Sequence, residues 1–324
     1  MRICLYGAGA VGGLIGGRIA ASGRPLSVVA RGATLEALQR DGLGLEGAEG
    51  RRHFPVRAVA DPAALGEQDL VIVAVKQPAM ASVAAAIGPL IGPHTKVMTA
   101  MNGVPWWFFD GLPGPLAGTQ LASVDPAGDL RRRIPSAQVI GCVVHIACAT
   151  PVPGVSRHKM GNGLITGEAA GPASGATQAV AAVLGGAGFD VTVSECIQRD
   201  IWFKLWGNMT MNPVSALTGA TTDRILDDPL VNEFCVQVME EAAALGERIG
   251  CPVTQSPAAR NAVTRELGAM KTSMLQDVEA GRMLEIDALL GAVHEIAGRA
   301  GVAVPATAAL LGLVRLFASV RGLR

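Results

Sequence analysis

One cation and two amides stand at helical spacing in the C-terminal half of the 324-residue sequence. Lys204, Asn208 and Asn212 are four residues apart, which places their side chains along one side of a helix. An ammonium group in such a position can bind a carbonyl oxygen and donate a proton to it, and amides bind polar substrate groups. Two interpretations remain open from these residues alone: the solvated face of an amphipathic helix, and one wall of a substrate site.

A second polar cluster lies further along the chain. Ser273, Asp277 and Glu285 share a sector of about 120° on a helix if the helical turn continues past Gly281. Taken alone, this pattern favours a charged, solvated helix face with a glycine break over a catalytic site.

A glycine-rich segment follows the first apolar run of the chain. Residues 2–6 predict a buried strand, and residues 10–21 predict a helix. The glycine-rich segment, Gly7-Ala8-Gly9-Ala10-Val11-Gly12, begins directly after the strand and extends into the first residues of the helix. In this context the first glycine permits a tight turn, the second lets the backbone approach a pyrophosphate, and the third lets the helix pack closely on the strand. The segment therefore predicts a dinucleotide site; a glycine-rich turn without a ligand is the alternative.

Arg31 follows the second predicted strand, residues 26–30. In dinucleotide-binding folds, an acidic residue about twenty positions beyond the glycines binds the ribose 2′-hydroxyl of NAD. No acid stands here, and an arginine can pair with a 2′-phosphate instead. The sequence therefore favours NADP over NAD, with an ordinary surface arginine as the alternative.

Strand and helix patterns alternate as far as residue 195. Helices are expected at 33–40, 80–91 and 176–184, a hairpin insertion at 43–59, and further strands at 69–75, 96–101, 118–124, 139–146, 164–167 and 190–193. Lys76 and Asn102 follow two of these strands, at the edge where open α/β sheets bind ligands. The alternation predicts an α/β Rossmann-type doubly wound sheet.

Helical spacing dominates the rest of the chain. Helices are expected at 197–218, 230–249, 257–267, 270–280, 285–300 and 306–319. The expected organisation is therefore a dinucleotide-binding domain, residues 1–195, followed by an all-α substrate domain, residues 196–324.

The composition excludes several classes of protein. Lys plus Arg and Asp plus Glu both total 27, so no nucleic-acid or membrane partner is expected. The single tyrosine, Tyr6, lies on the first strand, which excludes a Tyr-x-x-x-Lys dehydrogenase. Six cysteines without a Cys-x-x-Cys pair and five scattered histidines give no metal spacing and predict reduced thiols. With no signal peptide and no apolar run of the ~20 residues needed to span a bilayer, a cytoplasmic protein is expected.

The order of the motifs resembles that of the ketopantoate reductase (2-dehydropantoate 2-reductase) family. The matching segments are the glycine-rich segment, Val75-Lys76, Asn102-Gly103, Lys204-Leu205 with Asn208 and Asn212-Pro213, Ser273-Met274-Leu275-Gln276-Asp277, and Glu285-Ile286-Asp287. The resemblance covers nearly the whole chain. It implies NADPH-dependent reduction of ketopantoate to pantoate, a step of pantothenate and coenzyme A biosynthesis, at a site in the cleft between the two domains.

The resemblance also implies a role for each matching residue. Lys204 would be the catalytic lysine, and Glu285 would act beside substrate and cofactor. The implied substrate-binding residues are Asn102, Asn208, Asn212 and Ser273, and the implied NADP-binding residues are Gly7, Ala8, Gly9, Ala10, Val11, Gly12, Arg31, Lys76, Asn102 and Glu285. The implied partner is a small 2-keto acid, no metal is implied, and analogy with other helical second domains suggests a homodimer.

Three features depart from the family pattern. Thr222 stands where the family has a further substrate-binding asparagine, Ile146 replaces a typical alanine, and residues 105–130 are longer and more aromatic, with Trp106 and Trp107. For the aromatic residues, packing or a lid edge is favoured over substrate recognition. The departures leave open a related 2-hydroxyacid dehydrogenase acting on another branched 2-keto acid. A non-catalytic NADP-binding regulator is the second alternative, although it would not explain Lys204 with Glu285.

Overall fold

The computed structural model describes residues 1–324, and the chain divides into two compact units. Unit 1 comprises Met1–Met101 and Asp129–Ile197, and unit 2 comprises Asn102–Gly128 and Gln198–Arg324. Unit 2 is therefore assembled from two separate parts of the chain. The division inferred from the sequence, at residue 195, assigned the first of these parts to the other domain.

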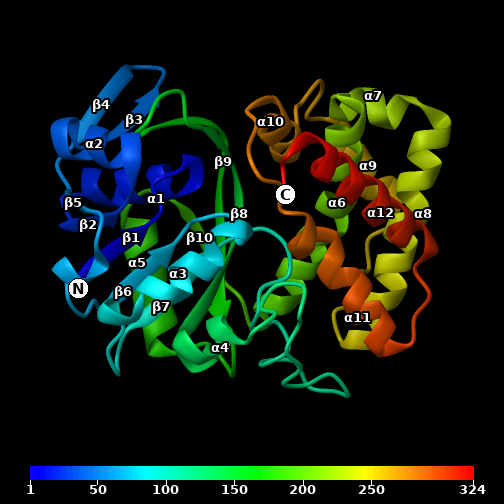
Figure 1. Ribbon diagram of the computed structural model, residues 1–324, viewed down its shortest axis with the longest axis horizontal. Helices are drawn as coiled ribbons and strands as arrows, with labels where there is room; N and C mark the ends of the chain where they lie inside the picture. Colours follow the sequence, from blue (N-terminus) through cyan, green and yellow to red (C-terminus); the bar gives the residue numbers. More distant parts are fainter. The chain divides into compact units, whose positions relative to one another are not determined.

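Ten strands form one mixed sheet in unit 1 (Figure 1). They are β1 (Ile3–Tyr6), β2 (Leu26–Val29), β3 (Leu43–Gly47), β4 (Gly50–Phe54), β5 (Arg57–Val59), β6 (Leu70–Val73), β7 (Lys96–Ala100), β8 (Val139–Ala149), β9 (Val155–Glu168) and β10 (Asp190–Val193). Their order is β4-β3-β9-β8-β7-β6-β1-β2-β5, with β10 beside β9. Only the pairs β3–β4 and β8–β9 are antiparallel, so the expected hairpin insertion is confirmed as β3–β4.

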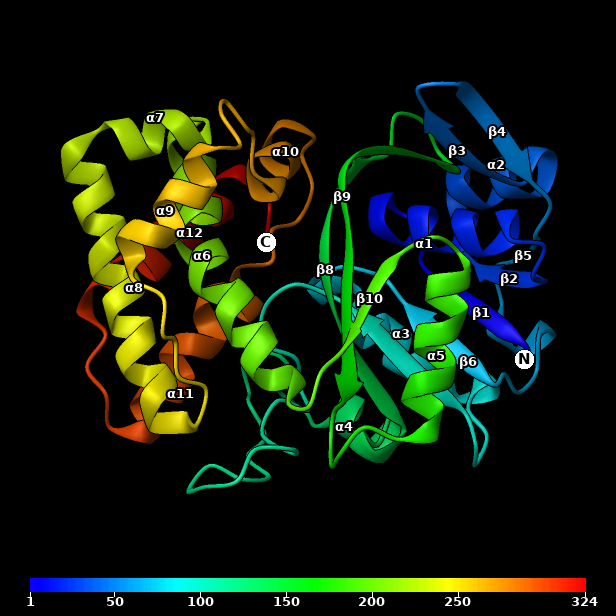
Figure 2. The same cartoon turned by 180° about the vertical axis from the view of Figure 1, so that it is seen from behind.

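Helices cover both faces of this sheet. They are α1 (Ala10–Ala21), α2 (Gly32–Asp41), α3 (Met80–Ala86), α4 (Asp129–Arg133) and α5 (Gly175–Gly186). Helix α3 lies in front of the sheet in Figure 1, and α5 lies in front in Figure 2, which shows the opposite side. All residues of β1 and β6 are buried, as strands covered on both faces require. The Rossmann-type fold predicted from the sequence is confirmed.

Strand β1 lies between β2 and β6. The chain passes from β1 to β2 on one side and later returns to β6 on the other side. The topological switch point therefore lies between β1 and β6, and open α/β sheets bind their ligands at the carboxyl ends of such strands. Gly7 follows β1 and Lys76 follows β6, so both stand at this edge.

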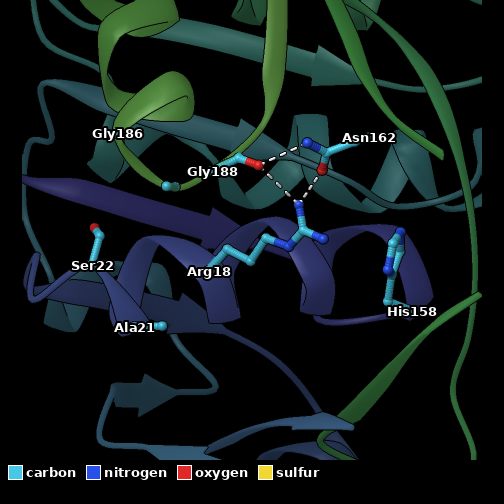
Figure 3. A pocket seen from close by; sticks show the side chains of 8 residues that line it. Arg18, Ala21, Ser22, His158, Asn162, Gly186 and Gly188 are labelled. Atoms are coloured by element: carbon cyan, nitrogen blue, oxygen red, sulfur yellow. Dashed lines mark hydrogen bonds between the residues drawn. The ribbon is translucent and has the colours of Figure 1, made fainter. Parts of the chain in front are cut away.

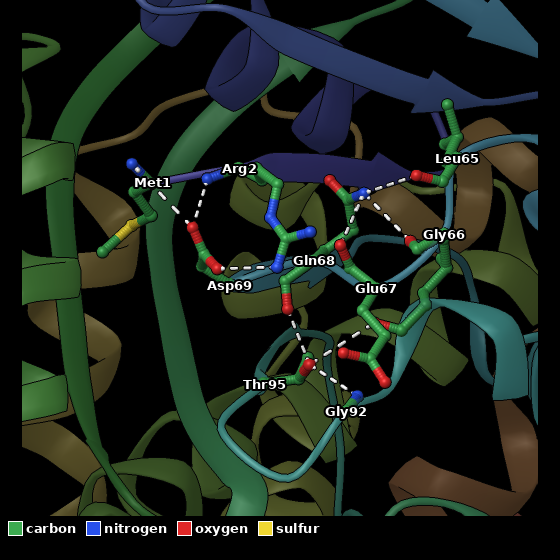
Figure 4. A network of polar contacts seen from close by, with 10 residues as sticks. Met1, Arg2, Leu65, Gly66, Glu67, Gln68, Asp69, Gly92 and Thr95 are labelled. Carbon is green, nitrogen blue, oxygen red and sulfur yellow. Dashed lines mark hydrogen bonds and ion pairs between the residues drawn. The ribbon is translucent and has the colours of Figure 1, made fainter.

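A polar network holds the opposite ends of the same two strands (Figure 4). The amide and the guanidinium of Arg2 donate to the Asp69 carboxylate at 2.5 and 3.2 Å. Thr95 Oγ1 donates to the Gln68 carbonyl at 2.6 Å and accepts from the Gly92 amide at 2.8 Å. The hydrogen bond from the Arg2 amide holds the pKa of Asp69 below its usual value. These contacts fix the register of β1 against β6, and with it the position of the glycine-rich turn.

The large C-terminal part of unit 2 is helical, as predicted. Its helices are α6 (Ile197–Thr218), α7 (Thr222–Asp227), α8 (Pro229–Ile249), α9 (Pro257–Arg265), α10 (Ser273–Glu279), α11 (Ala292–Ala300) and α12 (Pro305–Arg321), with a π-helical turn at Asp287–Gly291. The sequence did not predict the short helix α7. None of the helices combines the length and the apolar character that a membrane crossing requires.

The strand expected at 118–124 is wrong, because this segment consists of turns and bends. Pro113 and Pro115 precede it, and proline cannot donate to a sheet ladder. The amides of Ala122 and Ser123 donate instead to the carboxylate of Glu295 on α11, at 3.0 and 2.8 Å. The segment is therefore an irregular loop held against α11.

The aromatic segment of this loop is part of the core of unit 2. Trp106, Trp107, Phe108 and Phe109 are all buried. The Phe108 ring lies 6.0 Å from that of Trp202 on α6, centroid to centroid. The packing interpretation of these aromatic residues is confirmed.

Ser273 and Glu285 do not lie on one helix. Helix α10 stops at Glu279, and Gly281 has a φ of +63°, a left-handed conformation that favours glycine. The break expected between the helices 270–280 and 285–300 is therefore confirmed, and Ser273, Asp277 and Glu285 do not share one continuous helical face.

None of the six cysteines forms a disulfide. The buried ones are Cys4, Cys142, Cys235 and Cys251, and Cys148 and Cys196 are half-buried. Burial raises the pKa of Cys4 and of Cys235 to about 12, and that of Cys148 to about 11. These three thiols are therefore protonated at neutral pH and chemically quiet.

Candidate active site

The glycine-rich turn of unit 1 has the close contacts that its sequence predicts. Gly7 has a φ of +98°, and a Cβ added to it would lie 2.5 Å from Val75 Cγ1. A Cβ added to Gly12 would lie 2.1 Å from the Gly7 carbonyl oxygen and 2.9 Å from Ala74 Cβ. Helix α1 therefore approaches β1 and β6 more closely than any side chain at residue 12 would permit.

Gly9 differs from the other two glycines because its missing side chain faces open space. A Cβ added there would meet no atom within 4 Å, and its φ of −77° is accessible to any residue. Gly9 is also the N-cap of α1, where no side chain caps the helix. An uncapped helix N-terminus with room above it presents backbone amides and a partial positive charge. These features of the chain fit the pyrophosphate of a dinucleotide.

Two cations stand near the carboxyl ends of the neighbouring strands. Exposed Arg31 occupies the N-cap position of α2, after β2, and half-buried Lys76 follows β6. Burial raises the pKa of Tyr6 at the end of β1, and the positive charge of Arg31 opposes that rise. Arg31 is therefore close enough to the end of β1 to interact with Tyr6. The structure thus places both cations at the edge of the sheet that carries the glycine-rich turn.

A separate shallow pocket of about 510 Å³ lies at the other end of α1 (Figure 3). Its lining includes Arg18, Ser22, His158, Asn162 and Gly188. Arg18 donates to the Gly188 carbonyl at 3.3 Å and to Asn162 Oδ1, so the protein itself engages the guanidinium. Arg18 lies about 12 Å along the helix axis from the first residue of α1, at 1.5 Å per residue. This pocket is therefore distinct from the dinucleotide site.

In unit 2, two tryptophans fix the orientation of α6. Trp202 Nε1 donates to the Ala242 carbonyl at 3.2 Å, and Trp206 Nε1 donates to the Met239 carbonyl at 2.7 Å. These bonds attach one side of α6 to α8. Residues two positions away from each tryptophan lie about 200° around the helix. Lys204 and the two amides that follow it are therefore on the opposite side.

The predicted substrate-binding residues of unit 2 meet in pairs along this side. Lys204 Nζ donates to Asn102 Oδ1 at 2.8 Å. Asn212 Nδ2 donates to Ser273 Oγ at 3.4 Å, and the Asn212 side chain is buried. Asn208 lies between the two pairs and is half-buried. The structure therefore brings together, on one helix face, groups that are up to 171 residues apart in the chain.

Glu285 is linked to the same region through the backbone. It is buried, with 8% of its surface exposed, and stands two residues before the π-helical turn. The Val104 amide donates to the Ala288 carbonyl in that turn at 2.9 Å, and a Cβ on Gly103 would lie 2.6 Å from the same oxygen. The loop that carries Asn102 is therefore held against the turn that follows Glu285. Such π-helical turns are frequent at functional sites.

Two polar residues singled out in the sequence have structural contacts. Asp277 Oδ1 accepts from Arg282 Nε at 2.9 Å. Thr222 Oγ1 donates to the Gly268 carbonyl at 2.9 Å, and its amide donates to the Met270 carbonyl at 3.0 Å. Thr222 thus holds the segment that leads into α10. This is a structural contact, in contrast to the substrate contact implied for the asparagine at this position of the family.

An arginine that was not singled out from the sequence lies beside α6. Arg260 of α9 places its guanidinium 5.8 Å from the Phe203 ring centroid. A Cβ on Gly207 would lie 3.0 Å from both Nε and Nη2 of Arg260. The available signal was Gly207 itself, since glycine inside a helix costs ~1 kcal/mol relative to alanine and often marks a close approach.

Comparisons with known proteins match the chain to two family models. The family model described as "Ketopantoate reductase PanE/ApbA" matches residues 3–171, and "Ketopantoate reductase PanE/ApbA C terminal" matches residues 196–318. A 2-dehydropantoate 2-reductase from Mesorhizobium japonicum is 43% identical over 323 residues, 99% of each chain. One from Halobacterium salinarum is 30% identical and covers 98% of each chain. A solved structure of a candidate ketopantoate reductase from Ralstonia solanacearum MolK2 is 61% identical, with a TM-score of 0.96 over 100% of this chain and 99% of that one.

Proposed function

The chain belongs to the ketopantoate reductase family, and we propose that it reduces ketopantoate to pantoate with NADPH, using Lys204 as general acid. The family is one of nicotinamide-dependent oxidoreductases. The family match and the 43% identical relative assign the reduction of ketopantoate, a small 2-keto acid, to this chain, in agreement with a role in pantothenate biosynthesis. The observation that carries the proposed mechanism is the pairing of Lys204 with Asn102 on the polar side of α6.

We propose NADP rather than NAD as the cofactor. The glycine-rich turn would hold the pyrophosphate at the N-terminus of α1, and Lys76 would add positive charge at the same edge of the sheet. Arg31 occupies the position at which an acid would select NAD, and its guanidinium can pair with a 2′-phosphate. When bound, NADPH supplies the hydride that reduces the C2 carbonyl carbon of the substrate.

Lys204 completes the reaction at the carbonyl oxygen. Its ammonium group binds this oxygen, stabilises the negative charge that develops there, and donates a proton to give the hydroxyl of pantoate. Asn102 accepts a hydrogen bond from Lys204 Nζ and so orients the ammonium group. Glu285, which the loop of Asn102 connects to this region, would hold the lysine or the reacting hydroxyl in position.

Neutral polar groups would bind the remainder of the substrate. Asn208 and Asn212 lie on one face of α6, and Ser273 of α10 contacts Asn212. Amides and a hydroxyl can satisfy a substrate carboxylate and its terminal hydroxyl without adding charge. A substrate that lacks this hydroxyl leaves buried polar groups unpaired, which is a strong source of selectivity.

The catalytic assignment is tested by Lys204→Ala, with Lys159→Ala as a matched control. Lys159 is an exposed lysine of β9 in unit 1 and outside every proposed site. We expect Lys204→Ala to lower kcat by at least ~10²-fold, the magnitude of a lost general acid, while NADPH binding is retained. Lys159→Ala should behave as the wild type. Near-normal turnover of Lys204→Ala would remove the proposed role, and NADPH binding without any turnover in the wild type would favour a regulator.

The substrate is tested by comparing ketopantoate with 2-ketoisovalerate, its analogue without the 4-hydroxyl. A preference for ketopantoate above ~10²-fold in kcat/KM supports the proposed reaction. Comparable values would favour a broader 2-hydroxyacid dehydrogenase, the alternative raised by Thr222 and by Ile146, which lies in the β-bulge of β8. A homodimer and a cytoplasmic location also stay predictions; light scattering after size-exclusion chromatography tests the first.

A further inference from the structure

Arg260 carries a positive charge that the protein does not neutralise. Its Nε is buried and has no hydrogen-bond partner, and no carboxylate forms an ion pair with the guanidinium. Its only partner of opposite electrostatic character is the face of the Phe203 ring, 5.8 Å away. Burial lowers the pKa of Arg260, and no acidic residue opposes this effect. A half-buried guanidinium without a counter-charge is costly, and an anionic partner from outside the chain would offset this cost.

The location of this charge is set by α6. The guanidinium rests on Gly207, whose absent side chain leaves the space that Nε and Nη2 occupy. Gly207 lies three residues after Lys204 and directly before Asn208. Side chains three or four residues apart on a helix are separated by about 5–6 Å. Arg260 therefore flanks the polar face of α6 one helical turn from the proposed general acid.

We propose that Arg260 binds the carboxylate of the 2-keto acid substrate, an inference that rests on the proposed function. The carboxylate carbon of such a substrate is bonded directly to the carbonyl carbon, so a cation for each group must lie within a few ångströms of the other. Lys204 takes the carbonyl oxygen, and the planar guanidinium can take both carboxylate oxygens in a bidentate pair. Arg260 is then a specificity-determining residue that selects acids over neutral carbonyl compounds.

A purely structural role for Arg260 makes a different prediction. If its function were only to stack on Phe203, its removal would lower stability and would affect charged and neutral substrates alike. If Arg260 binds the carboxylate, its removal instead raises KM for the anionic substrate with kcat little changed, because the ground state and the transition state lose the same contact.

The test compares Arg260→Gln and Arg260→Lys with Arg265→Gln as the matched control. Arg265 lies on the same helix, is exposed, and pairs with Asp227. Each protein is assayed with ketopantoate and with its cyclic ester, ketopantolactone, which keeps the carbonyl but has no carboxylate. The NADPH dissociation constant and the thermal midpoint are measured for every variant.

We expect Arg260→Gln to raise KM for ketopantoate about 10- to 100-fold, the usual consequence of losing a hydrogen-bonded charge partner, with kcat changed less than about 3-fold. Arg260→Lys should recover part of the loss because it keeps the charge. KM for the lactone, the NADPH affinity, and the Arg265→Gln control should stay at wild-type values. Equal effects on acid and lactone, or an unchanged KM for the acid, would overturn the assignment and leave the proposed function intact.

A second variant keeps the proposal testable if Arg260→Gln does not fold. Gly207→Ala places a methyl group 3.0 Å from the guanidinium and must displace it slightly, while alanine favours the helix. We expect a smaller rise in KM for ketopantoate, with no loss of thermal stability. An unchanged KM in this variant would also count against the proposal. A wild-type protein that does not reduce ketopantoate would refute the proposed function itself, and with it the role of Arg260.

Discussion

The three glycines of the nucleotide turn should respond differently to the same added methyl group. At Gly12 the new Cβ would lie 2.1 Å from a backbone oxygen and 2.9 Å from Ala74 Cβ. Neither atom belongs to a flexible side chain, so α1 itself must move. Overpacking costs about 1–3 kcal/mol, and we take the upper end because backbone is involved. The higher helix propensity of alanine offsets about 1 kcal/mol of this cost. Without cofactor, the free energy of unfolding of Gly12→Ala should therefore be about 2 kcal/mol lower than that of the wild type.

At Gly9 the same change should leave the free protein almost unaffected. The added Cβ meets nothing within 4 Å, and the φ of −77° suits alanine. Alanine is a poorer N-cap than glycine, which lowers the free energy of unfolding, but it also reduces the entropy of the unfolded chain, which raises it. The two effects offset each other to within about 0.5 kcal/mol. The methyl group would instead occupy the space proposed for the pyrophosphate. We expect Gly9→Ala to weaken NADPH binding about 10- to 100-fold.

The assay has to report on unit 1. All four tryptophans lie in unit 2, so urea unfolding is followed by far-ultraviolet circular dichroism rather than by tryptophan fluorescence alone. NADPH affinity is measured separately by titration of the cofactor's fluorescence. Wild-type NADPH affinity in Gly9→Ala, or wild-type stability in Gly12→Ala, would refute the reasoning from the contacts of this turn.

Two further predictions concern charged groups. Arg31→Ala should weaken NADPH binding at least about 10-fold more than NADH binding, since one charge-assisted contact to phosphate is lost; equal losses in the two titrations would show that Arg31 does not touch the 2′-phosphate. At Glu295, burial raises the carboxyl pKa, but hydrogen bonds from Ser123 and Ala122 and the contact with Arg299 outweigh it and leave the pKa lowered. Because the folded pKa lies below the unfolded one, this stabilisation is present above about pH 4.5 and is lost as the pH falls through the lowered value. Glu295→Gln should therefore cost about 1 kcal/mol at pH 7 in urea unfolding followed by tryptophan fluorescence, and a difference that does not shrink as the pH falls below about 4.5 would contradict this account.

The parts of the site that the sequence could predict are those with local signals. The glycine-rich turn is recognisable because the roles of its three glycines, a tight turn, room for a pyrophosphate and close helix packing, all lie within one continuous strand–turn–helix segment. Helix α6 was predicted with its observed limits, and its polar stripe followed from the four-residue spacing. These features depend on neighbours in the sequence, so single-chain patterns are sufficient to find them.

The parts that could not be predicted depend on distant contacts. The segment 102–128 continues directly from β7, yet its hydrogen bonds and ring contacts are with α6, α11 and the π-helical turn. Its apolar residues resemble those of a strand because a loop packed on a core also buries apolar side chains. Arg260 was not singled out because the relevant feature is the absence of an ion-pair partner for its guanidinium. Ion pairs between distant residues cannot be read from a sequence. By contrast, the end of α10 near Gly281 was predicted, because glycine is a local signal for the end of a helix.

The two-part origin of unit 2 has a consequence for the order in which the protein is made. Ala122 and Ser123 precede their partner Glu295 by 173 and 172 residues. At synthesis rates of about 5–20 residues per second, these residues wait roughly ten to thirty seconds on the ribosome before the partner exists. During that time the Trp106–Phe109 segment has not yet received the helices that bury it. The nascent chain therefore exposes four adjacent aromatic side chains, and exposed apolar surface of this kind makes a folding chain prone to aggregation.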